Sequence, residues 1–207
     1  MTWTHTFLDV FLHYVPKDVR SVLDVGCGRG IVGGLIRIYR EPERILGIDL
    51  FEPYLDFCEE LGVYTEVAKQ DLGRTPFPFK NKEFDLSVAL EVIEHLPKPK
   101  GQNLLDELQR ISKQVMVSTP NHYFHQDTYD QNRLQKHLSR WSVQDFERRG
   151  YTVLGVGGFL ILGREVRYIS YALGRLTLLL PRLSGTIMAI YSDQKEPSIR
   201  RRGLNSS

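Results

Sequence analysis

Residues 22–30 read VLDVGCGRG, an apolar run that ends in an acid and three closely spaced glycines. With Ser21 in front of it, the apolar part predicts a short buried strand over 21–25. Gly26–Gly30 predicts a tight turn, because glycine lets the chain turn sharply and lets a ligand approach bare backbone. Residues 31–40 are expected to follow as a helix. A strand, a glycine turn and a helix in this order indicate an α/β fold with a ligand site at the turn.

The glycine spacing admits two kinds of ligand. Gly28, Gly30 and Gly33 satisfy the loose G-x-G-x-x-G pattern of dinucleotide sites, so an NAD-type oxidoreductase is one interpretation. Asp24 argues against it, because a carboxylate at the strand end would repel a pyrophosphate. The same carboxylate suits a cationic ligand that carries an amino group, which is the interpretation we favour.

Strands and helices alternate along the rest of the chain. The expected strands are 44–50, 63–67, 84–90, 114–118, 151–157 and 186–192, and the expected helices are 5–15, 52–61, 101–112 and 142–149. This alternation predicts a mostly parallel sheet covered on both faces, with ligands beyond the carboxyl ends of its strands. The length of 207 residues predicts one domain over 1–195, followed by a disordered basic tail over 196–207.

Acidic side chains follow successive strands of the predicted sheet. Asp49 ends the second strand, 19 residues after Gly30, where its carboxylate could accept both hydroxyl protons of a ribose. Asp71 follows the third strand, where it could accept a hydrogen bond from an adenine amino group. A lone acid at such a place is usually a solvated loop residue or a helix cap. Together with Asp24 and the glycine turn, these acids favour a nucleoside site.

Four segments resemble the class I S-adenosylmethionine-dependent methyltransferases: VLDVGCGRG at 22–30, LGIDL at 46–50, AKQDL at 68–72 and FDLSVALEVIEHLPK at 84–98. The resemblance runs from about residue 18 to 160. It implies a Rossmann-like three-layer sandwich with a seven-stranded, mostly parallel sheet whose last strand is antiparallel. It also implies S-adenosylmethionine as cofactor and a methyl transfer to oxygen, or alternatively to nitrogen.

The resemblance also implies roles for individual residues. Asp24 and Gly26 would hold the methionine part of the cofactor, and Asp49 its ribose. Leu50 would pack on the adenine, whose edge Asp71 and Leu72 would read. The implied cofactor-binding set is Asp24, Gly26, Gly28, Gly30, Asp49, Leu50, Asp71, Leu72 and Glu91.

The run EVIEH at 91–95 is similar to two metal-using branches of that family, the small-RNA 2′-O-methyltransferases and the ubiquinone-pathway O-methyltransferases. The RNA enzymes have a further ligand in an H-x-x-x-W context, which His137 and Trp141 match. We therefore expect Glu91, Glu94, His95 and His137 to bind a divalent ion: Mg²⁺, Mn²⁺, Fe²⁺ or Zn²⁺. The alternative is that Glu94 and His95 merely tie a helix to a loop.

The segment 119–141 is long and polar for a loop in a compact domain, which is typical of functional loops. His122, Tyr123, His125 and Tyr129 could line the acceptor pocket there. An oxygen or nitrogen acceptor can need a base to remove its proton, and the candidate catalytic histidines are His95, His125 and His137. A cofactor-binding regulatory module without catalysis remains the alternative from another class of function.

The overall composition gives few hints about the acceptor. A net charge of +2 provides no strong field for nucleic acid, so a small-molecule or lipid-linked acceptor is favoured, with RNA still open. The two cysteines lack metal or redox spacing, and no signal peptide is evident, so we expect a cytoplasmic protein. Residues 159–185 interleave leucines with arginines. This pattern has two interpretations. One is a helical insertion whose apolar face packs on the sheet or on a second subunit, and the other is an interfacial helix on an anionic membrane.

Overall fold

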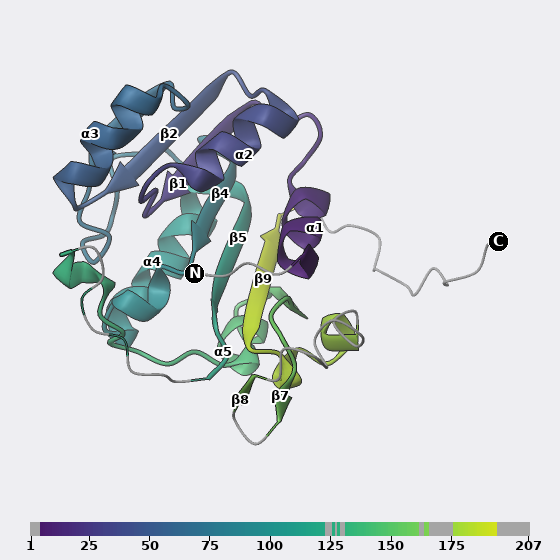
Figure 1. Ribbon diagram of the computed structural model, residues 1–207. Helices are drawn as coiled ribbons and strands as arrows, with labels where there is room; N and C mark the ends of the chain where they lie inside the picture. The colour runs from purple at the N-terminus through teal and green to yellow at the C-terminus, as the bar shows by residue number, and fades with distance from the viewer. Residues whose placement is uncertain are drawn as a thin grey trace.

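The computed structural model describes residues 5–122, 126, 128, 131–161, 164–165 and 176–193 (Figure 1). Its main sheet has seven strands in the order β3-β2-β1-β4-β5-β9-β6. The strands are β1 (Ser21–Val25), β2 (Arg44–Asp49), β3 (Glu66–Lys69), β4 (Phe84–Leu90), β5 (Ser112–Pro120), β6 (Thr152–Gly155) and β9 (Thr186–Ser192). Only β9 runs against its neighbours, because it pairs antiparallel with both β5 and β6. The mostly parallel sheet with an antiparallel last strand is therefore confirmed.

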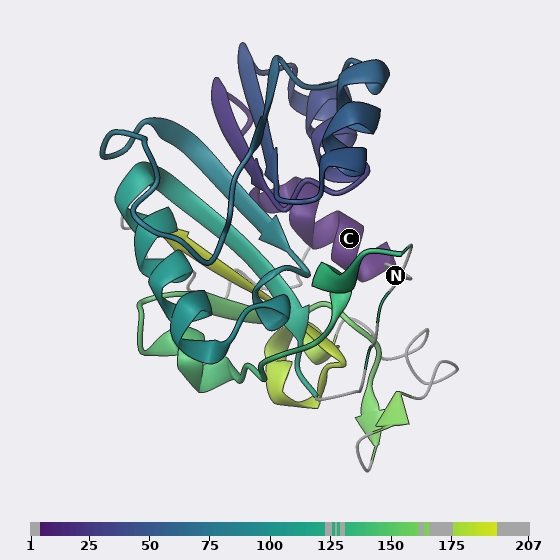
Figure 2. The same ribbon diagram turned by 90° about the vertical axis from the view of Figure 1, so that its left-hand side faces the viewer.

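Helices cover both faces of this sheet (Figure 2). They are α1 (His5–Tyr14), α2 (Ile31–Arg40), α3 (Glu52–Leu61), α4 (Lys98–Ile111) and α5 (Val143–Glu147), with single 3₁₀ turns η1 (Ile93–His95), η2 (Arg133–Gln135) and η3 (Pro181–Leu183). The apolar side chains of α1 and α2 pack on one face, and those of α4 and α5 pack on the other. The result is the expected three-layer sandwich.

The central strands β1, β2 and β4 are largely apolar because both of their faces are buried. Neighbouring residues of β1 show this: Val22 packs with the α1 and α2 cluster, and Leu23 packs with the α4 cluster. Successive side chains of a strand point to opposite faces, so a strand between two helical layers needs apolar residues at every position. The same rule makes the one buried acid of β1, Asp24, exceptional, since its side chain is only 2% exposed.

Several expected boundaries move. The third strand begins at Glu66 rather than at residue 63, because its pairing with β2 begins where Glu66 lies opposite Leu46. The fifth strand is longer than expected and runs to Pro120. Within 159–185 the structure describes a short hairpin of β7 (Leu160–Ile161) and β8 (Arg164–Glu165), which the sequence did not indicate.

Much of 159–185 and the whole tail 196–207 lie outside the described residues, so the two interpretations of 159–185 and the disordered tail stay predictions. Among the residues that are described, no helix has the length and apolar character needed to cross a membrane.

Candidate functional site

The glycine turn leaves a cradle of open backbone at the carboxyl end of β1. Gly26, Gly28 and Gly30 all have positive φ angles, of 68°, 52° and 77°. A Cβ on Gly26 would lie 2.7 Å from the Val92 side chain, so this glycine is needed for packing. A Cβ on Gly28 would come no closer than 3.9 Å to any neighbouring heavy atom, the Gly26 carbonyl oxygen. Gly28 therefore faces the open space that a bound ligand requires.

Asp49 borders this cradle at the end of β2. One carboxylate oxygen accepts the Gly28 N–H at 3.1 Å, and the other accepts the Phe51 N–H at 2.9 Å. The two bonds fix the plane of the carboxylate beside the turn. Each oxygen keeps further acceptor capacity, as binding of a vicinal diol requires. The half-buried Leu50 lies next in the chain, and the nucleoside roles expected of both residues stay predictions.

Asp24 lies beneath the turn rather than on its open side. Its Oδ2 accepts the Tyr64 hydroxyl at 2.6 Å, and it also accepts the backbone N–H of Gly33. Burial raises the pKa of Asp24 to about 7, against the lowering effect of those two donors. The carboxylate thus supports the turn from inside, and direct contact with a methionine ammonium stays a prediction.

Asp71 and Leu72 follow β3, at the same carboxyl-terminal edge of the sheet as Asp49 and the glycine turn. One Asp71 oxygen accepts the Gly73 N–H at 2.9 Å, and the other pairs with Arg74 Nε at 3.1 Å. Arg74 is 84% exposed, so this ion pair holds Asp71 only weakly. Leu72 packs against the core cluster on the α4 face. Their role at an adenine edge remains a prediction.

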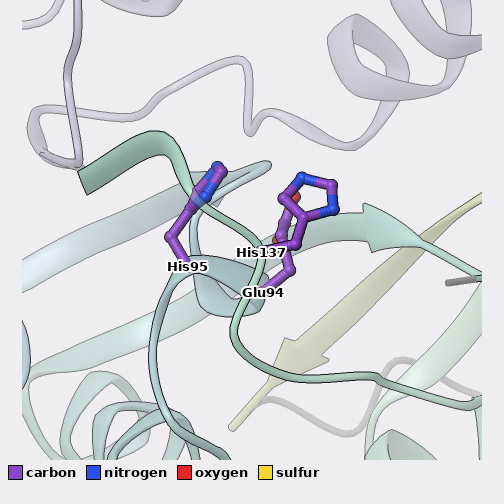
Figure 3. A group of neighbouring side chains, drawn as sticks. All are labelled: Glu94, His95 and His137. Atoms are coloured by element: carbon purple, nitrogen blue, oxygen red, sulfur yellow. The ribbon is translucent and has the colours of Figure 1, made fainter. Parts of the chain in front are cut away.

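Glu94 and His95, which follow β4, converge with His137 (Figure 3). Each offers one ligand atom, and these atoms lie within 4.8 Å of one another. Glu94 and His95 come from η1, whereas His137 lies 42 residues further along the chain. The two imidazole centroids are 5.0 Å apart. Of the predicted metal-binding set, these three residues are brought together.

Backbone bonds hold the His137 segment against η1. The Glu94 carbonyl accepts the N–H groups of Leu138 and Ser139, at 2.8 and 3.0 Å. Trp141 is 1% exposed, and its indole N–H donates to the Ile93 carbonyl at 3.3 Å. The tryptophan of the H-x-x-x-W pattern therefore anchors the segment that carries His137.

The surroundings of the three side chains suit a cation. His95 Nδ1 lies 3.2 Å from the Lys136 carbonyl, which can only accept, so Nδ1 carries the proton and Nε2 keeps its lone pair. Thr119 Oγ1 donates to Glu94 at 3.0 Å and orients that carboxylate. Burial, and next the charge of Glu91, raise the pKa of Glu94 well above its ordinary value. Burial lowers the pKa of His95 to about 4, so this imidazole is neutral, as a metal ligand must be.

Glu91 lies outside this group of three, which departs from the predicted four-ligand set. A common ligand face would require residues 91–95 to form one helical turn. Instead, Glu91 has a φ of 57° at the end of β4, and its carboxylate accepts the Ser118 hydroxyl of β5 at 2.8 Å. Burial raises the pKa of Glu91 to about 7. Its left-handed backbone turns the side chain toward β5.

The loop histidines are only partly described. His125, Tyr123 and Tyr129 lie outside the described residues. His122 is half-buried, with Nδ1 3.3 Å from the Gly185 carbonyl. Sequence reasoning missed Tyr64 and Thr119, which orient Asp24 and Glu94. Thr119 could have been proposed from the sequence, because it directly follows the expected fifth strand at the ligand-binding edge of the sheet.

Known proteins are similar to this chain in part of its sequence and in its fold. Residues 22–114 match the family model described as "Methyltransferase domain". The ubiquinone biosynthesis O-methyltransferase of Pseudomonas syringae is 31% identical over 112 residues, which cover 49% of this chain and 45% of that protein. The chain thus spans about half the length of the curated relatives it matches.

Two solved structures show the same fold. An S-adenosylmethionine-dependent methyltransferase from Archaeoglobus fulgidus has a TM-score of 0.62 at 19% identity, covering 89% of this chain and 90% of that one. The small RNA methyltransferase HEN1 has a TM-score of 0.62 at 17% identity, covering 91% of this chain and 25% of that one. Residues 22–114 are thus similar in sequence to a methyltransferase domain, and the fold is that of S-adenosylmethionine-dependent methyltransferases.

Proposed function

We propose that this protein transfers the methyl group of S-adenosylmethionine to an oxygen atom of its acceptor, with a divalent metal ion beside the point of transfer. The observation that carries the proposal is the convergence of Glu94, His95 and His137 just after β4. Gly26 of the turn and Val92 of the segment after β4 pack so closely that a Cβ on Gly26 would clash. The cofactor cradle and the candidate metal centre therefore belong to one site.

The cofactor half of the site needs little chemistry from the protein. S-adenosylmethionine, when bound, supplies a methyl group on a sulfonium that is already a good leaving group. The chain has to align that methyl with the acceptor, and alignment carries much of the rate. Gly28 provides the open backbone, Asp49 would bind the ribose, and Leu50, Asp71 and Leu72 would surround the adenine. Asp24 would act from beneath the turn.

The metal half of the site supports an oxygen acceptor. One buried carboxylate and two imidazoles form a donor set that suits Mn²⁺, Fe²⁺ or Zn²⁺ better than Mg²⁺. A divalent ion, when bound, supplies a Lewis acid that lowers the pKa of a nearby hydroxyl. Glu94 and the two histidines would hold it, and Thr119 and the Lys136 carbonyl would keep two of these ligands oriented. Glu91 stays available as a proton acceptor near them.

We propose a hydroxyl of a small or lipid-linked molecule as the acceptor. The name of the Pseudomonas syringae relative, an O-methyltransferase of ubiquinone biosynthesis, supports an oxygen acceptor of this kind. The net charge of +2 is small for a protein that must hold a nucleic acid. The name of HEN1 suggests RNA as the alternative acceptor. Methyl transfer to an RNA fraction, in an assay with labelled S-adenosylmethionine, would reject the small or lipid-linked hydroxyl.

Metal titration tests the proposal without knowledge of the acceptor. We expect calorimetry with Mn²⁺ and Zn²⁺ to show one saturable site per chain, and Glu94→Gln and His137→Asn to weaken it at least about tenfold. His13→Asn, on α1, is the matched histidine control and should bind normally. S-adenosylmethionine should bind all of these variants with ordinary affinity. Absence of saturable metal binding up to millimolar concentration would return Glu94 and His95 to a structural role.

A further inference from the structure

Tyr64 links the glycine turn to a distant loop. It lies between α3 and β3, and its hydroxyl donates to Asp24 at 2.6 Å, across 40 residues of sequence. Asp24 is only 2% exposed and accepts its other protein hydrogen bond from the Gly33 N–H of α2. The acid of the turn is thus held from two sides by groups outside the turn itself.

The ring of Tyr64 explains why three nearby positions are glycine. A Cβ on Gly33 would lie 2.4 Å from the ring, one on Gly47 3.0 Å, and one on Gly30 3.3 Å. The distance at Gly33 is shorter than any van der Waals contact, so a side chain at position 33 would clash with the Tyr64 ring. The third glycine of the G-x-G-x-x-G pattern, Gly33, therefore makes room for Tyr64 rather than for a ligand.

The loop around Tyr64 is fixed on both flanks. Arg37 of α2 donates from Nε to the Val63 carbonyl at 3.1 Å. The Thr65 hydroxyl donates to the Ile45 carbonyl at 2.9 Å and accepts the Ile45 N–H at 3.0 Å. The phenol is therefore preorganised by neighbours on α2 and β2, as a group that positions a binding site must be.

We infer that Tyr64 is a positioning residue of the cofactor site, which holds the Asp24 carboxylate ionised and aligned beneath the glycine turn. The inference rests on the proposed function, since it concerns the same site. A buried carboxylate favours its neutral form, and a phenol donor favours the charged form. A charged Asp24 complements the ammonium and sulfonium of S-adenosylmethionine, whereas a neutral one does not.

Other titratable groups face Asp24 as well. Asp49 approaches from the end of β2 and disfavours a second negative charge. The thiols of Cys27 in the turn and Cys58 on α3 are also neighbours, and Cys58 donates to the Gly28 carbonyl at 3.2 Å. A Cys58→Ser variant keeps a donor there and removes the thiol. It separates titration of this thiol from titration of Asp24.

Calorimetric titration of S-adenosylmethionine from pH 6 to 9 tests the inference. Tyr64→Phe keeps the ring and removes the hydroxyl, so the pKa of Asp24 should rise further. We expect affinity to fall about five- to tenfold at pH 6–7, with the difference closing by pH 9. In an Asp24→Asn background the same substitution should add no further loss, because the two side chains act as one unit. Tyr39→Phe, exposed on α2, should behave like the unsubstituted chain, and Cys58→Ser should keep the pH dependence of the unsubstituted chain.

A second variant, on α2, tests the role of Tyr64 without changing Tyr64 itself. Gly33→Ala would displace the ring of Tyr64 and should reproduce the pH-dependent loss. Gly34→Ala is its matched control on α2, because its Cβ would meet only the Val63 side chain, at 4.0 Å. An unchanged pH profile in Tyr64→Phe, or a loss that persists in the Asp24→Asn background, would overturn the inference while leaving the proposed function intact. No binding by the unsubstituted chain at any pH would overturn the proposed function, and this inference with it.

Discussion

Replacement of Gly28 by alanine separates ligand binding from folding at the glycine turn. An added Cβ would find only the Gly26 carbonyl oxygen, at 3.9 Å, so the ligand-free protein has room for it. The remaining cost is the left-handed backbone at a φ of 52°, about 1–2 kcal/mol. In the complex, the same methyl group would project into the space that we assign to the cofactor.

The expected loss of affinity follows from that overlap. Forcing one extra methyl group into a packed contact costs about 1–3 kcal/mol, which corresponds to roughly a five- to 150-fold weaker complex. Gly62→Ala is a matched control, because Gly62 has a φ of 67° at the end of α3 and an added Cβ would meet nothing within 4 Å. The two variants should therefore lose similar stability, and only Gly28→Ala should lose affinity.

Thermal unfolding and calorimetry with S-adenosylmethionine measure the two quantities separately. We expect Gly28→Ala and Gly62→Ala to unfold at similar temperatures, a few degrees below the unsubstituted chain. The affinity of Gly62→Ala should be unchanged. If Gly28→Ala binds the cofactor within twofold of Gly62→Ala, the open face of Gly28 is not the cofactor cradle.

Three further predictions concern the carboxylates. Asp49→Ala should weaken cofactor binding by about 1.5–3 kcal/mol, the range for a hydrogen bond to a charged group, and unchanged calorimetric affinity would reject its ribose role. Glu94→Gln should lose Mn²⁺ binding at least about tenfold, whereas Glu91→Gln should stay within about threefold, and equal losses would place Glu91 among the ligands. Burial raises the pKa of Asp24 from 3.8 to about 7 in the folded protein, so the unfolded chain loses this proton at lower pH. The free energy of unfolding should therefore fall as pH rises from about 4 to 7, by up to ~4 kcal/mol from this group. Asp24→Asn should flatten that slope in denaturant titrations, and an unchanged slope would contradict the account.

The sheet was predictable from local patterns. The last strand, 186–192, has the bounds that its apolar run indicated. The helix expected over 142–149 is present as Val143–Glu147, and Ser142 and Asp145 form a capping box at its start. The third strand was misplaced because Val63 and Tyr64 look like strand residues. Tyr64 instead packs against glycines of three other segments, and no local pattern reports such a contact.

Part of the candidate site was also predicted from the sequence, and part depends on contacts that only the folded structure makes. His137 was expected from the resemblance to the H-x-x-x-W context, and its role as a ligand stays a prediction. Trp141 of that context anchors the segment to η1, 48 residues away in the sequence. Glu91 does not join the other three residues, since its positive φ turns it away from a face shared with Glu94 and His95. The bond between Tyr64 and Asp24 joins residues 40 apart and depends on the packing of α3 against the sheet. Pairings of that kind follow from tertiary structure and not from spacing.

The central claim is that this chain moves a methyl group from S-adenosylmethionine to an acceptor. Incubation with methyl-radiolabelled cofactor and fractionated cell extract tests it most directly, with Gly28→Ala as the matched control for the cofactor site. We expect the unsubstituted chain to label an acceptor fraction, and Gly28→Ala to label that fraction at least about fivefold less at limiting cofactor. Chelator should suppress the labelling while cofactor binding persists. A chain that binds S-adenosylmethionine but labels no fraction above the Gly28→Ala background would contradict the claim.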